Sequence, residues 1–146
     1  MTKNQTAPRI LSVLAVLCLL LTSLTACSGG VTREEAKTAM DSLLTALGNE
    51  NYAEAAALYH PDYAMTEELL SAFVEEVKTK VGIDLTEGAA VEKITGFSSS
   101  YYDSTVDGSR YKLTARIKAG DKTAFLTLEV IRNDNGYGIF QVECYP

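Results

Sequence analysis

The hydrophobic pattern of this chain changes its period once, in the loop between Asp84 and Ala89. Before that loop, apolar residues recur three or four positions apart, which is the spacing of one face of an α-helix. After it, apolar and polar residues alternate, most clearly from Tyr111 to Lys118, which is typical of a strand with one buried and one wet face. Helices followed by strands in this way predict a single domain of the α+β class.

Three helices are expected before the loop, and each follows a residue that can cap its first turn. Thr32 and Glu35 have the spacing of a capping box at the start of the first helix. Gly48 and Gly82, which end helices, are the last residues of the first and third segments, and Pro61 follows the second. The expected ranges are 32–48, 51–59 and 66–82.

Four strands are expected after the loop. Asp107-Gly108 and Asn135-Gly136 are strong hairpin-turn sequences, and a further turn is expected at residues 120–121. In the segment 123–132, apolar residues occupy both odd and even positions, which face opposite sides of a strand. This pattern predicts a central strand that is covered on both faces for part of its length. The sequence therefore predicts three N-terminal helices packed on one face of a curved, four-stranded antiparallel sheet.

The first 26 residues have the pattern of an export signal. Lys3 and Arg9 give it a positive start, and the run from Ile10 to Leu21 is apolar except for one serine. This run is shorter than the roughly 20 residues that a transmembrane helix needs. Counted on to Ala26, it reaches the lower limit of a spanning segment, so an uncleaved membrane helix is the alternative.

The signal ends in the sequence LTAC, residues 24–27, followed by serine and two glycines. It resembles the lipobox of bacterial lipoproteins, in which the cysteine receives diacylglycerol and the chain is cut before it. The resemblance implies a lipid on Cys27 and attachment to the extracytoplasmic side of the cell membrane. Two acyl chains anchor a protein stably, whereas one binds only marginally. We therefore expect a signal peptide at 1–26, a lipidated tether at 27–31 and a single domain at 32–146.

The expected mature domain is acidic and has few side chains for redox or metal chemistry. The chain has 13 basic and 19 acidic residues, and loss of Lys3 and Arg9 leaves 11 against 19, a net charge of −8. This balance argues against nucleic acid as a partner and against docking on anionic lipid, because both need clustered cations. Beyond Cys27, one cysteine and one histidine remain, Cys144 and His60, so we expect no disulfide, no metal site and no cofactor. Cys144 is expected to be a small buried side chain, with a reactive thiol as the alternative.

Two short motifs give the domain a resemblance to a known superfamily. Residues 46–55, ALGNENYAEA, resemble the first helical hairpin of nuclear transport factor 2-like domains. Residues 135–139, NGYGI, are similar to the start of their last strand, with Tyr137 where tryptophan is common. The resemblance implies a cone in which the helices and the bent sheet enclose a pocket. It does not choose a function, because the superfamily includes isomerases, dehydratases and binding proteins.

The sequence offers two candidate ligand-binding sites and no catalytic motif. His60, Asp62 and Tyr63 lie in one turn, where they could supply a base and a hydrogen-bond donor to a substrate. Alternatively, this turn is exposed and Asp62 accepts hydrogen bonds from nearby backbone amides. Tyr101 and Tyr102 follow three serines and could line a polar pocket, or lie on the outer face of an edge strand.

The function expected from these features is a non-enzymatic, lipid-anchored binding or accessory module for a small ligand or a membrane-protein partner. Two alternatives are left open. The first is a pocket enzyme that uses His60 or Asp62 for proton transfer or hydrolysis, and it predicts a buried imidazole. The second is a structural subunit that forms a homodimer through its sheet, and it predicts a mass in solution that depends on concentration.

Overall fold

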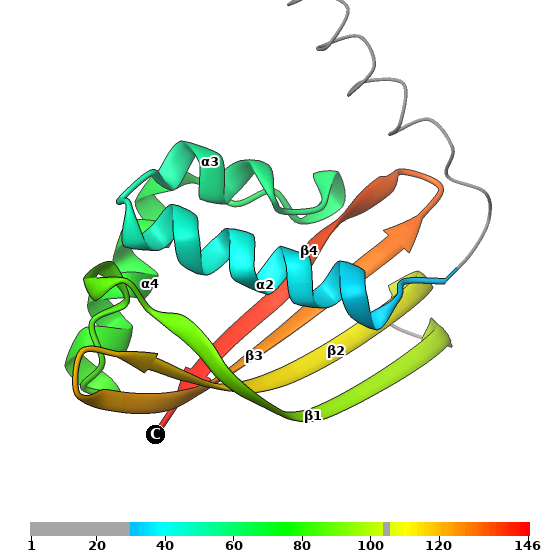
Figure 1. The fold of residues 1–146 in the computed structure, drawn as a ribbon. Coiled ribbons are helices and arrows are strands. Elements are labelled where there is room, and N and C mark those ends of the chain that lie inside the picture. Colours follow the sequence, from blue (N-terminus) through cyan, green and yellow to red (C-terminus); the bar gives the residue numbers. More distant parts are fainter. Residues whose placement is uncertain (1–29, 104–105) are drawn as a thin grey trace, which may run out of the picture.

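The computed structural model describes residues 30–103 and 106–146, apart from the side chains at 101–107 (Figure 1). The helical segments are three α-helices and two short 3₁₀ helices: α2 (Arg33–Gly48), α3 (Tyr52–Ala57), η1 (Pro61–Tyr63), α4 (Glu67–Lys80) and η2 (Leu85–Glu87). The strands are β1 (Ala90–Asp103), β2 (Val106–Ala119), β3 (Lys122–Asn133) and β4 (Gly136–Tyr145).

Each α-helix begins at the capping residue that the sequence predicted. At the start of α2, the hydroxyl of Thr32 accepts a hydrogen bond from the Glu35 N–H at 3.2 Å, and the Glu35 carboxylate accepts one from the Thr32 N–H at 2.9 Å. Asn51 and Thr66 likewise accept hydrogen bonds from backbone N–H groups in the first turns of α3 and α4. A side-chain cap of this kind contributes about 1 kcal/mol to helix stability.

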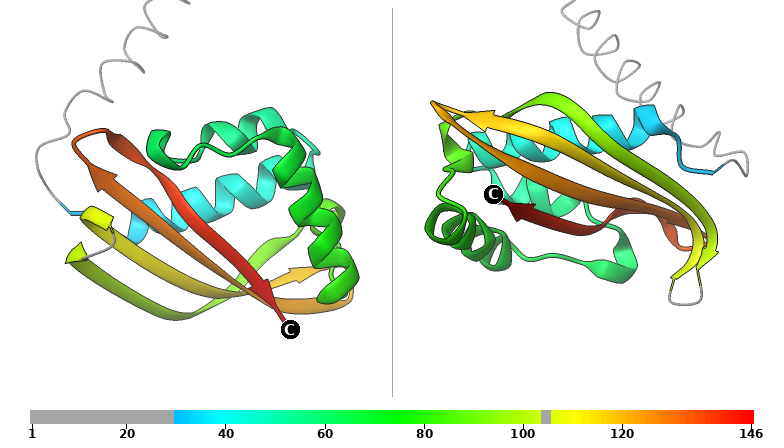
Figure 2. Two further views of the ribbon diagram at one scale, coloured as in Figure 1. Left: turned by 180° about the vertical axis from the view of Figure 1, so that it is seen from behind. Right: turned by 90° about the horizontal axis from the view of Figure 1, so that it is seen from below.

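The strands form one antiparallel sheet in the order β1-β2-β3-β4. On the inner face of the sheet, Leu113 and Ala115 of β2 lie opposite Leu128 and Leu126 of β3, and these side chains are buried in the core. Residues on both faces of β3 are buried for part of its length, as the sequence predicted. On the outer face the buried residues are Thr127, Glu129 and Ile131. No helix in the described ranges covers this outer face, which is seen from below in Figure 2.

One predicted turn is wrong. Asp107 and Gly108 belong to β2, because Asp103 of β1 pairs with Val106 and the hairpin therefore reverses before them. Gly108 has a φ of 141°, a backbone conformation that favours glycine, but it adopts this conformation within β2 and not in the turn. The Asp-Gly sequence identifies a flexible position and does not by itself identify the end of a strand.

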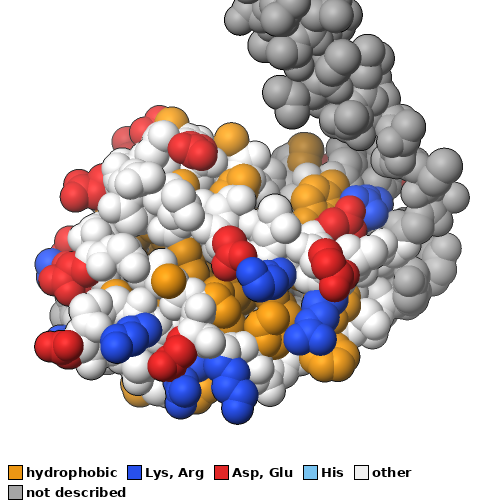
Figure 3. Space-filling model, in the orientation of Figure 1, with side chains coloured by type: hydrophobic (Ala, Val, Ile, Leu, Met, Phe, Trp, Pro, Cys, Tyr) orange, Lys and Arg blue, Asp and Glu red, His pale blue; other side chains and the backbone are white. Residues whose placement is uncertain are grey.

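Helix α2 lies across the inner face of the sheet, where it contacts β1, β2 and β3 (Figure 1). Its apolar stripe is buried: Ala36, Met40, Leu43, Leu44 and Leu47. Burial of one leucine or methionine side chain contributes about 1.5–3 kcal/mol. Hydrophobic side chains remain visible between α2 and the strands below it in Figure 3. Phe97 of β1 is 64% exposed, and the guanidinium of Arg33 lies over its ring at 5.3 Å from the centroid.

The expected layering, three helices on a cone-shaped sheet, is wrong. Helix α2 makes the extensive contacts with the strands, whereas α3 packs between α2 and α4, and α4 packs mainly on α3 and η2 beside one end of the sheet (Figure 2). The two 3₁₀ helices were not expected, and η1 contacts β4. An apolar stripe shows that a helix has a buried face, but not which element covers that face. The structure supports the broader class, an α+β fold with a four-stranded antiparallel sheet.

Candidate functional site

His60 lies where the helical part of the chain meets the edge strand β4. The Leu58 carbonyl accepts a hydrogen bond from the Ile139 N–H at 2.9 Å, and the Ile139 carbonyl accepts one from the His60 N–H at 3.0 Å. These bonds join Tyr59 and Ile139 in a short parallel bridge. The close approach requires glycine at position 138, since a Cβ on Gly138 would lie 2.4 Å from the backbone nitrogen of His60. The bridge therefore fixes the position of the His60 side chain over the β3–β4 hairpin.

The imidazole of His60 is fully buried, and both of its nitrogens have partners. Nδ1 accepts a hydrogen bond from the Asp62 N–H at 3.1 Å, so the pattern assigns the proton of the neutral ring to Nε2. Nε2 lies 2.9 Å from Oδ1 of Asn133, which also accepts from the Asn135 N–H at 2.9 Å. In this arrangement the ring has no nitrogen left for a substrate, although its burial agrees with what a pocket enzyme would need.

Asp62 is exposed, and two asparagine side chains bind its carboxylate. Nδ2 of Asn135 donates to Oδ1 and Oδ2 at 3.1 and 2.9 Å, and Nδ2 of Asn133 donates to Oδ2 at 3.2 Å. These bonds, that from Asn135 first, hold the pKa of Asp62 below its usual value. The donors come from the β3–β4 hairpin and not from the neighbouring backbone amides that the exposed-turn interpretation expected.

Tyr63 completes the packing around this turn. Its ring lies 5.9 Å from the His60 ring and meets the edge of Phe140 at 4.5 Å, measured between ring centroids. The hydrogen-bonded part of the cluster, which we call the hairpin latch, consists of His60, Asp62, Asn133 and Asn135. The sequence pointed to the two residues on the helical side and missed the two asparagines. Their only sequence signal is their position at a turn, where asparagine commonly bonds to local backbone.

The side chains of the remaining predicted site residues lie outside the part of the chain that the structure describes. Cys27 precedes the first described residue, and the side chains of Tyr101 and Tyr102 fall in the range 101–107. The backbones of both tyrosines belong to β1, and Tyr101 pairs with Ser109 of β2. Ligand binding by these tyrosines, and by the turn at His60, stays a prediction.

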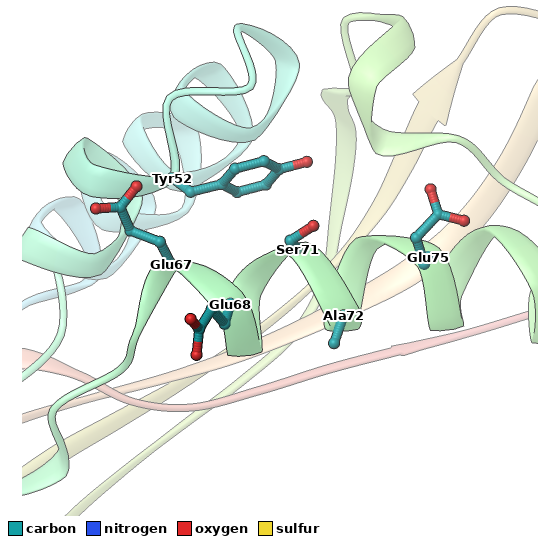
Figure 4. A pocket seen from close by; sticks show the side chains of 6 residues that line it. All are labelled: Tyr52, Glu67, Glu68, Ser71, Ala72 and Glu75. Carbon is teal, nitrogen blue, oxygen red and sulfur yellow. The ribbon is translucent and has the colours of Figure 1, made fainter.

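An open groove of about 500 Å³ lies between α3 and α4. In Figure 4 the Tyr52 ring extends over α4, and Glu67, Ser71 and Glu75 stand on the side of that helix facing the ring. Their spacing of four residues places them on one helix face. Glu68 and Ala72 complete the lining. Such a surface attracts cations but does not enclose a ligand.

A second groove, of about 320 Å³, lies between η2 and the β2–β3 turn. At its wall, the carboxylate of Asp84 accepts hydrogen bonds from Nζ of Lys78 at 2.6 Å and from the N–H and hydroxyl of Thr86 at 3.0 and 2.7 Å. These bonds, that from Lys78 first, lower the pKa of Asp84 to about 2. Asp84 therefore holds the start of η2 as an anion and is a poor candidate for a general base at neutral pH.

The lowered pKa of Asp84 predicts a specific acid sensitivity. Because its folded-state pKa lies below its unfolded value, the ionised carboxylate stabilises the fold above about pH 4, and this contribution is lost as the pH falls towards about 2. Asp84→Asn should therefore lose less stability than the wild type over this range, measured by urea unfolding at each pH. Asp41→Asn, which removes an exposed ion pair with Lys37 inside α2, is the control. Equal acid sensitivity in the two variants would contradict the assignment.

Cys144 is half-buried on β4 and forms no disulfide. Burial raises the pKa of its thiol to about 11, so the thiol is protonated near neutral pH and is a weak nucleophile. Within residues 30–103 and 106–146, no group of three or more His, Cys, Asp or Glu side chains is arranged to hold a metal ion.

Comparison with known proteins adds no relative: no protein-family model and no curated protein matches this sequence. Among the helices of the described ranges, none is long and apolar enough to cross a membrane. What the protein does must therefore be inferred from its own residues.

Proposed function

We propose that this protein is a lipid-anchored accessory domain on the extracytoplasmic side of the cell membrane, where it binds a small ligand or a membrane-protein partner without catalysing a reaction. The anchor is the lipid on Cys27, at the end of the LTAC sequence. Its two acyl chains would hold the protein at the bilayer without any spanning segment in the mature chain.

The observation that carries this proposal is the position at which the folded domain begins. Val31 is already buried, and its N–H donates a hydrogen bond to the hydroxyl of Ser109 at 2.8 Å. The Gly30 carbonyl accepts a hydrogen bond from the Arg132 guanidinium at 3.5 Å. Three residues therefore separate Cys27 from Val31. An extended chain of this length reaches roughly 15 Å, so the domain would stay beside the bilayer surface.

The geometry at the hairpin latch favours binding over catalysis. A general base needs a free lone pair within reach of the proton that it removes. Both nitrogens of His60 are bonded within the protein, and the carboxylate of Asp62 is held as an anion by two amides. These contacts support a structural role for the turn, which leaves the grooves and the sheet as surfaces for a ligand or partner.

The anchor is tested by Cys27→Ala in the native host. We expect the wild-type protein to fractionate with membranes and to have an intact mass equal to the chain from residue 27 plus its acyl chains. The variant has no thiol to carry the acyl chains, so it should lose the added mass and move to the soluble fraction. Cys144→Ala, which changes the other cysteine of the expected mature chain, should behave as the wild type. Membrane association that does not change in the Cys27 variant would contradict the proposal.

The binding part of the proposal is tested by native mass spectrometry of the same membrane preparation. Extra mass that leaves on denaturation would support a small ligand and would identify it. A bare monomer that can be cross-linked to a membrane protein would support a protein partner. A bare, stable homodimer without either would contradict an accessory role and would favour the structural alternative.

A further inference from the structure

The net negative charge of the domain is distributed unevenly between its two layers. Residues 32–89, which include all three α-helices, contain 12 acidic and 4 basic side chains. Residues 90–146, which include the four strands, contain 7 of each. The helical layer therefore has all of the excess negative charge, and the sheet can present a face of the opposite sign.

Cations gather on the outer face of the sheet. Five side chains form a group that we call the basic stripe: Lys93 of β1 and Arg110, Lys112, Arg116 and Lys118 of β2. Successive side chains of a strand point to opposite faces, and the four β2 residues are separated by even numbers of positions, so they share one face. Lys93 lies opposite Arg116. Lys and Arg side chains are seen along the lower rim of Figure 3, over the strands.

Acidic neighbours hold part of the basic stripe in place without neutralising it. Glu129 of β3 is 7% exposed, and its carboxylate lies 3.4 Å from Nη1 of Arg110 and 3.1 Å from Nζ of Lys112. Glu92 lies 2.6 Å from Nε of Arg116. With Glu143 of β4, opposite Thr127, the described side chains of this face include three acids against five cations. Cations that are already ordered lose less conformational freedom when they bind an anion.

Aromatic rings continue the same face towards the C-terminus. Phe125 of β3 lies opposite Arg116 and stacks on Tyr145 of β4, with 5.7 Å between ring centroids. Tyr145 is 41% exposed. A tyrosine presents an apolar ring and a polar hydroxyl together, which suits the boundary between headgroups and acyl chains.

We propose that the outer face of the sheet docks on the anionic phospholipid headgroups of the bilayer that holds the lipid anchor, with the helical layer turned away from the membrane. This inference rests on the proposed anchor at Cys27. The tether enters the fold at the end of β2 where the basic stripe begins. The N–H of Val31 donates a hydrogen bond to the hydroxyl of Ser109, which precedes Arg110 in the chain and belongs to the inner face of the sheet. Anionic lipid attracts each nearby lysine or arginine, and it repels the acidic helical layer.

The net negative charge of the domain argues against docking on anionic lipid. This argument fails because the negative charge lies in the helical layer and the basic stripe lies on the opposite side, on the outer face of the sheet. Charges in solution are screened over about 10 Å at 0.1 M ionic strength. A bilayer therefore responds mainly to the face that is nearest to it, and much less to acidic groups on the far side of the helical layer. The tether keeps the end of the sheet beside Val31 at the surface, and the difference in charge between the two layers decides which of them turns towards the bilayer.

The proposal is tested by lysine acetylation of the full mature protein, purified from its host membrane. The protein is reconstituted in vesicles of phosphatidylcholine alone and in matched vesicles that also contain phosphatidylglycerol. We expect acetylation of Lys93, Lys112 and Lys118 to slow by about threefold or more in the anionic vesicles. Lys37 and Lys80 of the helical layer should react at the same rate in both.

Two double variants with the same change in net charge provide the control. Lys93→Glu with Lys118→Glu reverses two exposed cations of the basic stripe, whereas Lys80→Glu with Lys122→Glu reverses two exposed cations away from it. Lys122 pairs with Ala119 at the turn and lines the second groove. Lys112 should lose its protection in the first variant and keep it in the second.

Equal acetylation of the basic stripe in both kinds of vesicle would overturn the proposal, and so would equal loss of protection in the two variants. The same preparation separates this result from the test of the anchor, because its intact mass shows whether Cys27 has a lipid. A lipidated protein whose lysines are not protected would support the anchor at Cys27 and contradict docking by the outer face of the sheet. A protein without lipid whose lysines are still protected in anionic vesicles would contradict the anchor and support the docking.

Discussion

Replacing Gly138 with alanine is expected to lower the free energy of unfolding by about 3 kcal/mol. A Cβ at this position would lie 2.4 Å from the backbone nitrogen of His60 and 2.7 Å from its Cα. These are backbone atoms of another segment, so no side-chain rotation can relieve the overlap. The parallel bridge between Tyr59 and Ile139 would have to open and give up its two hydrogen bonds. Urea unfolding followed by circular dichroism measures the loss.

Gly96→Ala is the matched control for this substitution. Gly96 is also a strand glycine, but a Cβ there would meet the Cβ of Thr114 at 3.7 Å, which is ordinary van der Waals contact. Its unfolding free energy should stay within about 0.5 kcal/mol of the wild type. Similar losses at the two positions would show that the effect belongs to strand glycines in general and not to the contact between β4 and the helical part of the chain.

His60→Ala is expected to lower the free energy of unfolding by about 3 kcal/mol. The substitution would remove a buried ring, leave the Asp62 N–H without the Nδ1 acceptor, and leave Oδ1 of Asn133 with only the hydrogen bond from the Asn135 N–H. Asn133→Ala should cost less when His60 is already alanine, because the two residues share one hydrogen bond. A double-mutant cycle measured by urea unfolding gives this coupling.

Asn135→Ala tests the exposed end of the same cluster. Its side chain bonds to the carboxylate of Asp62, which lies in solvent, and its backbone N–H keeps the bond to Asn133 after the substitution. We therefore expect a clearly smaller loss than for His60→Ala. A His60→Ala variant as stable as the wild type would contradict a structural role for the imidazole and would return attention to the enzyme alternative.

Helix starts could be predicted from this sequence because caps are local. Thr32, Asn51 and Thr66 each bond to a backbone N–H within the next three residues, and all three were identified correctly. The Asp107-Gly108 turn failed for the opposite reason. The end of a hairpin is set by which residues pair across the strands, and the partner strand is not part of the local pattern.

The candidate site could be predicted only in part, because half of it comes from a distant segment. His60 and Asp62 were singled out by their types, but their partner Asn133 lies 73 residues from His60 and has no periodic signal that would connect the two. The charged side of β2 was visible in the alternation from Tyr111 to Lys118. Its meaning required the structure, which shows that α2 covers the other face of the sheet and that no helix of the described ranges covers this one.

The parallel bridge at Ile139 has a consequence for the order in which the chain folds. Each strand pairs with its neighbour in the sequence, so the sheet can form from hairpins with short loop closures. The bonds between the segment 58–60 and Ile139 instead join residues that are far apart in the chain, and they gain nothing until the sheet exists. We therefore expect the hairpins to assemble first and the contact between Tyr59 and β4 to close last, which would make this edge the place where the native protein opens most readily.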